Sequence, residues 1–392
     1  MNFTFCRKIL LKNPREMAKT CQRCIETCGA GKQDPTIVKA LTEAFEKLQK
    51  SDSKSLLKKY LTADVFQALL HRKTSFGSSL LDCIQSGVAN LDSGIGVYAA
   101  DVEAYTVFAE LFNPIIEEYH LNFTKTDTQP PVNFGNPNCM GDLDPKGQYI
   151  VSTRVRCGRS LAKYPLNPCM TEQNYLDLEQ EVKSALQRLT GEIYGDYIPL
   201  KDMSDAVQKR LIELGYLFSS TNTGFFMPYG RGMFINDKRN FFVWVNQDEH
   251  LKIFTMQEGG DLGMCYRRLI SGLQALSYQI KFARDSKFGF LNLCPSNIGT
   301  GFKVSVYAML PNLGLDESKL IKLVKECRLQ IKKVDEYLYK ISSKQSLGLC
   351  EWEVLHDFQD AILSILDQED KIGTFKRELF KSDCMCLKDF KN

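Results

Sequence analysis

The chain has 392 residues, of which 44% are hydrophobic and 25% charged, the composition of a globular protein long enough for two domains. Its net charge of +3 provides no bulk attraction to nucleic acid or to a membrane, so neither is expected as a partner. The 14 cysteines lie mostly singly within apolar runs, which is typical of reduced thiols in a cytoplasmic protein. No apolar run approaches the roughly 18 residues of a membrane span.

Residues 1–30 are interpreted as an N-terminal extension with an excess of basic side chains. Such a segment resembles a mitochondrial presequence, but its two acidic residues and its low serine content favour a cytoplasmic location. Cys21, Cys24 and Cys28 are closely spaced there. Because no matching second set of ligands follows them, no zinc site is expected.

Residues 31–119 predict a small all-helical domain. Residues 35–50 place their apolar side chains on one helical face, with Asp34 as the N-cap. A loop punctuated by glycines, residues 90–98, allows backbone amides to approach a ligand, although its pattern alone favours an ordinary turn. Further helices are predicted over residues 56–61, 65–70 and 101–118.

Residues 120–147 are rich in proline and glycine, which predicts a linker and a domain boundary. Residues 148–368 then alternate between strands and helices and form a second predicted domain. Residues 369–392, with Cys384 and Cys386, are interpreted as a poorly ordered tail. In the second domain helices are predicted over residues 171–189, 204–217, 262–279, 316–325 and 352–366, and residues 332–346 are interpreted as basic and irregular.

A predicted strand that begins at residue 149 carries Arg154 and Arg156 two positions apart. Side chains with this spacing face the same side of a strand. Two guanidinium groups on one face repel each other unless an anion lies between them, so a bidentate phosphate clamp is one explanation. A solvated edge strand is the alternative.

A second predicted strand, residues 240–245, contains the run FFVWV and ends at a cluster of acids and a cation, residues 246–252. Strand ends are a common position for catalytic groups, although an acidic strand end is most often a solvated loop.

Residues 288–311 read as a strand over residues 288–293, a glycine-containing loop and a second strand from residue 302, in which apolar and other side chains alternate. Cys294 lies at the mouth of the loop and Lys303 just past it. Backbone amides in such a loop can bind an oxyanion, and a neighbouring cation can hold a cysteine as thiolate. A plain hairpin with a half-buried cysteine fits the pattern equally well.

Four segments together carry a family resemblance: KTSFGSSLLDCIQSGVANLDSGIGVYAAD, DPKGQYIVSTRVRCGRSLAKYPLNPC, FFVWVNQDEHLKIFTMQEGGDLG and CPSNIGTG. In these segments the chain resembles the phosphagen kinases, the ATP:guanidino phosphotransferases, and within them the arginine kinases. The segments occur in the family's order, and the last is similar to the family's cysteine signature. The resemblance runs from residue 31 to residue 368.

The resemblance implies an α+β fold, with a small helical N-terminal domain, a larger C-terminal domain built on an antiparallel sheet flanked by helices, and a site in the cleft between them. It implies reversible transfer of the γ-phosphoryl group of Mg-ATP to a guanidino nitrogen, mainly by alignment and charge neutralisation. The expected partners are ATP or ADP with Mg²⁺, which has no protein ligand, and L-arginine or another guanidino compound. The chain is expected to be a monomer or a homodimer.

The resemblance also implies roles for three groups of residues. The loop that binds the amino-acid end of the substrate matches Ser93, Gly94, Ile95, Gly96, Val97 and Tyr98. The ATP-binding positions match Ser152, Thr153, Arg154, Val155, Arg156, Lys252, Lys303 and Lys332. The catalytic positions match Cys294 and Asp248, with Ser296 placed to hydrogen-bond the cysteine and to favour its thiolate.

Several positions depart from the family pattern. Gln247 and Asp248 replace a pair of glutamates, so the carboxylate of Asp248 is one methylene short. Lys252 and Lys303 replace phosphate-clamping arginines, which keeps the charge but loses the bidentate fork, and Tyr307 replaces a histidine.

The largest departure begins at Lys332, where the family has a flexible glycine-containing loop that closes over ATP and supplies a second glutamate. This chain is several residues shorter there and lacks the glycines. Asp335 or Glu336 could replace the glutamate, but a shortened loop is a poor lid. Two hypotheses follow: a working arginine kinase with a diverged site, or a catalytically impaired relative that binds arginine or nucleotide as a binding or regulatory protein.

Overall fold

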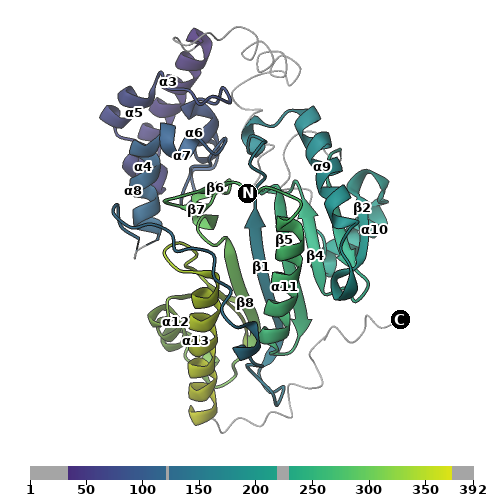
Figure 1. Ribbon diagram of the computed structural model, residues 1–392. Coiled ribbons are helices and arrows are strands. Elements are labelled where there is room, and N and C mark those ends of the chain that lie inside the picture. Colours follow the sequence, from purple (N-terminus) through teal and green to yellow (C-terminus); the bar gives the residue numbers. More distant parts are fainter. Residues whose placement is uncertain (1–33, 121–122, 219–228, 373–392) are drawn as a thin grey trace.

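The computed structural model describes residues 34–120, 123–218 and 229–372 (Figure 1). The expectations for the N-terminal extension, for its three cysteines and for residues 373–392 of the tail lie outside the described residues. The prediction of a poorly ordered tail is wrong for residues 369–372, which form the end of the last described helix, where the buried Glu369 accepts hydrogen bonds from the amides of Asn312 and Leu313. Within these described ranges, no helix is both long enough and apolar enough to cross a membrane.

The N-terminal region is helical, as predicted. The carboxylate of Asp34 caps the first described helix by accepting a hydrogen bond from the amide of Thr36 at 2.8 Å. The helix predicted over residues 101–118 is divided in two, because Phe108 has the non-helical angles φ −110° and ψ 34°. The described helices of this region are α3 (Pro35–Lys50), α4 (Leu56–Tyr60), α5 (Ala63–Leu69), α6 (Leu80–Ala89), α7 (Ala104–Val107) and α8 (Ala109–Tyr119).

An antiparallel sheet of eight strands forms the second part of the described chain, in the order β2-β3-β4-β5-β1-β8-β10-β9. Helical region and sheet together are the α+β fold that the sequence predicts. The strands are β1 (Ile150–Arg159), β2 (Gly195–Pro199), β3 (Gly232–Asn236), β4 (Phe241–Val245), β5 (Leu251–Glu258), β8 (Phe302–Met309), β9 (Leu329–Asp335) and β10 (Leu338–Ser343). A separate pair consists of β6 (Arg284–Asp285) and β7 (Gly289–Phe290).

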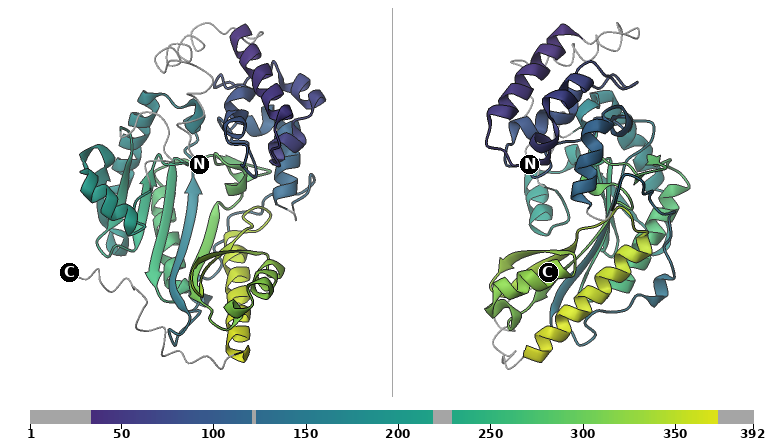
Figure 2. Two further views of the ribbon diagram at one scale, coloured as in Figure 1. Left: turned by 180° about the vertical axis from the view of Figure 1, so that it is seen from behind. Right: turned by 90° about the vertical axis from the view of Figure 1, so that its left-hand side faces the viewer.

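The two faces of the sheet differ. One face packs through fully buried side chains such as Val155, Val243 and Val304 against helices α9 (Glu172–Leu186), α11 (Leu262–Ser277) and α13 (Glu351–Ile372) (Figures 1 and 2). The opposite face is covered at one end by an aromatic cluster and by α10 (Asp205–Glu213). At its other edge β9 packs against α12 (Glu317–Glu326). Polar and charged side chains therefore remain in the centre of the second face.

The interpretation of residues 332–346 as irregular is wrong. Most of this segment belongs to the antiparallel hairpin of β9 and β10, in which Lys332 lies opposite Lys340. Tyr337, at the turn, has a φ of 57°, in the left-handed region. Successive side chains of this segment point to opposite faces of the sheet. The sequence does not show this alternation, because β9 is an edge strand with few buried positions and carries charged residues on several of the others.

The strand predicted over residues 288–293 is also wrong except at Gly289 and Phe290. Gly289 has a φ of 69°, and the amide of Phe290 donates to the carbonyl of Gly299 at 2.9 Å. The backbone at Gly289 folds back onto the loop at Gly299, because neither glycine has a Cβ that would prevent the close approach.

The same segment joins the helical region to the sheet. Phe288, Leu291 and Leu293 are buried in the core of the helical region. The amide of Ala99 donates to the carbonyl of Leu293 at 2.8 Å, and the hydroxyl of Tyr105 donates to the carbonyl of Asn292 at 2.6 Å. The loop that follows is thereby fixed at the junction of the two parts.

Candidate functional site

A row of cations crosses the polar face of the sheet. The strand register places Arg156 of β1 directly opposite Lys303 of β8, and Lys340 of β10 directly opposite Lys332 of β9. Arg154 lies two residues from Arg156 on the same face. Like charges directly opposite one another destabilise a sheet, and an anion bound between them would offset that repulsion.

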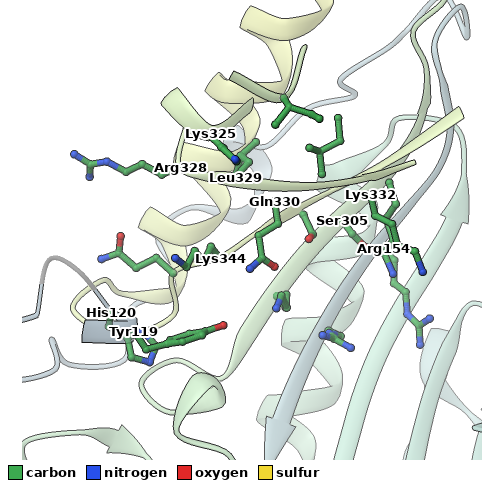
Figure 3. A pocket seen from close by; sticks show the side chains of 17 residues that line it. Tyr119, His120, Arg154, Ser305, Lys325, Arg328, Leu329, Gln330, Lys332 and Lys344 are labelled. Carbon is green, nitrogen blue, oxygen red and sulfur yellow. The ribbon is translucent and has the colours of Figure 1, made fainter. Parts of the chain in front are cut away.

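These cations line a cleft with a volume of about 900 Å³ (Figure 3). Among the described residues that line it, no aspartate or glutamate is present. The basic lining residues are Arg154, Arg156, Lys303, Lys325, Arg328, Lys332, Lys340 and Lys344. The cleft is therefore electrostatically suited to a polyanion and unsuited to a cation.

Arg154 is held by aromatic rings at the base of the cleft. Its guanidinium carbon lies 3.8 Å from the ring centroid of Phe254 and 5.5 Å from that of Trp244. Its Nε is buried and has no hydrogen-bond partner in the described part of the chain. Burial, with the nearby charge of Arg156, lowers the pKa of Arg154 to about 10. The neighbouring side chains Thr153 and Val155 turn away from this face and are buried.

Lys252 approaches the same row from β5. Its Nζ donates to Oε1 of Gln247 at 3.0 Å and lies 3.9 Å from Oδ2 of Asp248. Burial, and secondly the charge of Arg156, lowers the pKa of Lys252 to about 8. The same two causes lower the pKa of Lys303 to about 8. An arginine would stay fully charged under these conditions, so the two lysines make the charge of the site dependent on pH.

Cys294 lies beside the row, with its Sγ 3.0 Å from Oγ of Ser296, the distance expected of the predicted hydrogen bond. Burial nevertheless raises the pKa of Cys294 to about 11, and the charges of Glu249 and Asp248 also raise it. Without a bound cation the thiol form is therefore favoured, although the hydrogen bonds of Ser296 lower the pKa of Cys294 and so act in the predicted direction. A guanidinium group bound against the sulfur would lower the pKa again.

Glu249, which sequence reasoning missed, connects the segment after β4 by hydrogen bonds to the loop that contains Cys294. This loop, residues 291–301 between β7 and β8, is called the cysteine loop. Its buried carboxylate accepts a hydrogen bond from the amide of Leu293 at 2.7 Å and from Nδ2 of Asn297 at 3.2 Å. Burial raises the pKa of Glu249 to about 7. The acidic strand end noted in the sequence thus contains one solvent-accessible carboxylate, Asp248, and one structural carboxylate.

The predicted substrate loop lies on the other side of the cysteine loop. Gly96 has a φ of 83°, and its amide donates to Oγ of Ser93 at 3.1 Å. The carbonyls of Gly94 and Ile95 accept from the first turn of α4 at 3.0 and 2.8 Å. Ser93 and Gly94 line a second cavity of about 680 Å³, so the structure does not bring them into the cation-lined cleft. The chain just after the substrate loop contacts the cysteine loop through the hydrogen bond from the amide of Ala99 to the carbonyl of Leu293.

The two acids considered as replacements for a glutamate lie at the tip of the hairpin. Asp335 and Glu336 are exposed, and the amide of Glu336 donates to Oδ1 of Asp335 at 2.8 Å. Neither lines the cleft. Lys332 does line it, from the middle of β9.

The family described as ATP:guanido phosphotransferase matches through its N-terminal domain at residues 51–117 and through its C-terminal catalytic domain at residues 177–372. Similar proteins include the arginine kinase of Schistocerca americana, 46% identical over 86% of this chain and 99% of that protein, and the arginine kinase of Plodia interpunctella, 45% identical over 86% and 99%.

Solved structures agree with these similarities. The duplicated taurocyamine kinase from Schistosoma mansoni, with bound transition state analog components, has a TM-score of 0.80 and 31% identity over 84% of this chain. This chain spans about half of that duplicated protein, 48%. A lombricine kinase has a TM-score of 0.77 and 26% identity, over 84% of this chain and 94% of that protein.

Proposed function

The chain belongs to the ATP:guanido phosphotransferase family, and from that premise we propose that it binds ATP and L-arginine but transfers the phosphoryl group slowly. The family reaction for arginine is ATP + L-arginine = ADP + phosphoarginine. Two insect arginine kinases are 45–46% identical to this chain over 86% of its length, which favours arginine over other guanidino compounds.

The row of cations supports the nucleotide part of the proposal. In it, Arg154, Arg156, Lys252, Lys303 and Lys332 hold the phosphates of ATP or ADP. In this proposal Mg²⁺ arrives bound to the nucleotide, as the family reaction implies. It supplies further neutralisation of the phosphate charge.

The substrate side rests on Cys294, Asp248 and the loop from Ser93 to Tyr98. Asp248 has a side chain that is 40% exposed, so its carboxylate is free to meet a guanidinium group. Its single methylene limits its reach by comparison with a glutamate.

The hairpin of β9 and β10 is the observation that carries the proposal of slow transfer. Its strands are paired from Leu329 to Ser343, and its acids point to solvent at the tip. A lid that cannot close leaves the reacting groups hydrated and leaves out one positioned carboxylate. Losing one such acid–base group costs about 10²- to 10⁴-fold in rate. The alternative function is that of an inactive relative that binds nucleotide and arginine as a regulatory protein.

The proposal is tested by incubating the full chain with Mg-ATP and L-arginine and following phosphoarginine by phosphorus NMR. We expect a detectable product formed at least about 10²-fold more slowly than by an arginine kinase assayed in parallel. Turnover on the order of tens per second would contradict the slow-transfer proposal. Calorimetry with ADP and with arginine separates binding from transfer, and binding without any product would support the inactive alternative. Taurocyamine and lombricine, each assayed in place of L-arginine, test whether another guanidino compound is the better substrate.

A further inference from the structure

Lys340, on β10, is a cation of the cleft to which the proposed function assigns no role. The strand register places it directly opposite Lys332 of β9 and, on its other side, directly opposite Tyr307 of β8. Its neighbours along the strand, Tyr339 and Ile341, are buried in the core on the opposite face of the sheet. The side chain of Lys340 is half-buried and faces the cleft.

The register also brings Lys340 close to the arginines of β1. Ser342, two residues along the same face of β10, lies directly opposite Ser305 of β8. Ser305 in turn lies directly opposite Arg154. Figure 3 shows Arg154, Ser305 and Lys332 on the same side of the cleft. Because neighbouring strands lie about 4.8 Å apart, the long side chains of Lys340 and Arg154 approach the same part of the cleft.

The charge of Lys340 acts on the cations around it. Burial, and then the charges of Arg156, Arg154 and Lys332, lowers the pKa of Lys340. Its own charge also lowers the pKa of Lys303, after the larger effects of burial and of Arg156. Lys340 therefore belongs to the same electrostatic group as the cations that the proposed function assigns to the phosphates.

Lys340 has no neutralising partner among the described residues. Its side chain makes no ion pair and no hydrogen bond with them, and no described acid lines the cleft. Its Nζ lies 5.5 Å from the ring centroid of Tyr307, which attracts the charge but leaves the three donors of the ammonium group without an acceptor. Lys333 on the same hairpin differs, because it forms an ion pair with Glu317 of α12. The hairpin thus neutralises a lysine outside the cleft and leaves Lys340 unpaired inside it.

We propose that Lys340 is a phosphate-binding residue, which donates from Nζ to a phosphate oxygen of the bound nucleotide together with Lys332. A phosphate between the two lysines would replace their repulsion by charge-assisted hydrogen bonds. This inference rests on the proposed function, which places the nucleotide in the cleft. It goes beyond that function because it gives the paired hairpin a role in binding: β9 and β10 supply charge to the phosphates without closing over them.

The test is calorimetry of the full chain with ADP, comparing wild type with Lys340→Met, which removes the charge but keeps an apolar stem. We expect the Kd of ADP to rise by about tenfold. The urea midpoint of the unliganded variant should equal or exceed that of wild type, because a repulsion between like charges is removed. Lys340→Arg keeps the charge and the donors, so its Kd should stay within about threefold of wild type.

Lys333→Met is the matched control. It removes one charge from the same hairpin outside the cleft, so it should change the Kd of ADP by less than about twofold. A Kd for Lys340→Met equal to that of Lys333→Met would overturn the inference. Weaker binding by Lys340→Met that comes with a lower urea midpoint, and that Lys340→Arg does not restore, would assign Lys340 a purely structural role and would also overturn it.

Failure of wild type to bind ADP would instead contradict the proposed function. Inorganic pyrophosphate, titrated in place of ADP, then tests Lys340 without the rest of the nucleotide. Its Kd should show the same difference of about tenfold between wild type and Lys340→Met. Equal affinity of the two chains for pyrophosphate, or no binding to either, would overturn the assignment of Lys340 to a phosphate.

Discussion

At the scale of single residues, the site differs from an arginine-lined phosphate clamp in the two lysines that replace arginines. Lys252 and Lys303 both have a pKa of about 8 in the unliganded protein. Each carries its charge below that pH and loses it above. The sequence shows the replacements, but the burial that makes them titratable appears only in the fold.

Nucleotide affinity should therefore depend on pH. In the free protein the ammonium groups of Lys252 and Lys303 are lost as the pH rises through about 8, so we expect the Kd of ADP to increase by about tenfold from pH 7 to pH 9. The double variant Lys252→Arg with Lys303→Arg should flatten this dependence and bind ADP more tightly at pH 9. Calorimetry at three pH values is the measurement. A wild-type profile parallel to that of the double variant would count against the two lysines.

Glu249 makes stability depend on pH in a way that can be assigned to one residue. Its pKa is raised from 4.5 to about 7 in the folded chain, so folding favours its protonated form and stability falls as the pH rises from about 4.5 to 7. This change amounts to about 3 kcal/mol. Glu249→Gln removes the titration, and its free energy of unfolding relative to wild type should rise by that amount from pH 4.5 to pH 8.

Urea denaturation at the two pH values tests the assignment. Glu258→Gln, at the exposed end of β5, is the matched control and should follow the wild-type pH dependence. If Glu249→Gln also followed it, the buried carboxylate would not be the titrating group.

At the scale of elements, a regular spacing of apolar side chains predicts helices and strands correctly. Segments in which that spacing is interrupted are predicted wrongly. The alternation of Phe302 to Met309 predicted β8, and the cap at Asp34 predicted the start of α3. The hairpin of β9 and β10 escaped prediction because an exposed edge strand carries charges on most positions. The turn at Gly289 escaped because its conformation depends on pairing with Gly299, ten residues away in the sequence.

The candidate site shows the same division. Cations on strands β1 and β8 could be predicted from spacing and resemblance, and the structure places them together. Lys340 and His120 could not be predicted as parts of the site. Lys340 lies in a segment whose sequence indicates irregular structure, and His120 follows the end of a helix without any motif that indicates a role. The alternation of Lys340, Ser342 and Lys344 is the signal that could have identified the first. The direction of the pKa shift of Cys294 could not be predicted either, because burial raises the pKa by more than the hydrogen bonds of Ser296 lower it.

The loop from Ser93 to Tyr98 should be sensitive to a single methyl group. A Cβ on Gly96 would lie 2.8 Å from Cβ of Leu57, and its φ of 83° disfavours any other residue. Gly96→Ala should lower the free energy of unfolding by about 1–3 kcal/mol and weaken arginine binding. Gly94→Ala is the control, since a Cβ there meets no atom within 4 Å and its φ is not in the left-handed region. Equal stability of the two variants in urea would show that the loop tolerates the change.

At the scale of the whole molecule, the helical region and the sheet are joined through the cysteine loop, and the cleft opens beside that junction. The cation row lies on the sheet and Cys294 lies at the junction, whereas Ser93 and Gly94 of the predicted substrate loop line a separate cavity. A paired hairpin of β9 and β10 stands where the resemblance implies a closing loop. The proposed function therefore makes binding and transfer separable: it assigns attraction of the nucleotide to the sheet and the rate of transfer to closure.

The proposed separation of binding from transfer is tested most directly by replacing the tip of the β9–β10 hairpin with a longer loop. Residues 333–338 are replaced by the corresponding longer loop of the Schistocerca americana arginine kinase, and kcat for phosphoarginine formation is compared with that of the unaltered chain. The account predicts that kcat rises by about 10²-fold or more while the Kd of ADP changes by less than about threefold. A folded variant with normal ADP binding and unchanged kcat, or an unaltered chain that already turns over at tens per second, would contradict it.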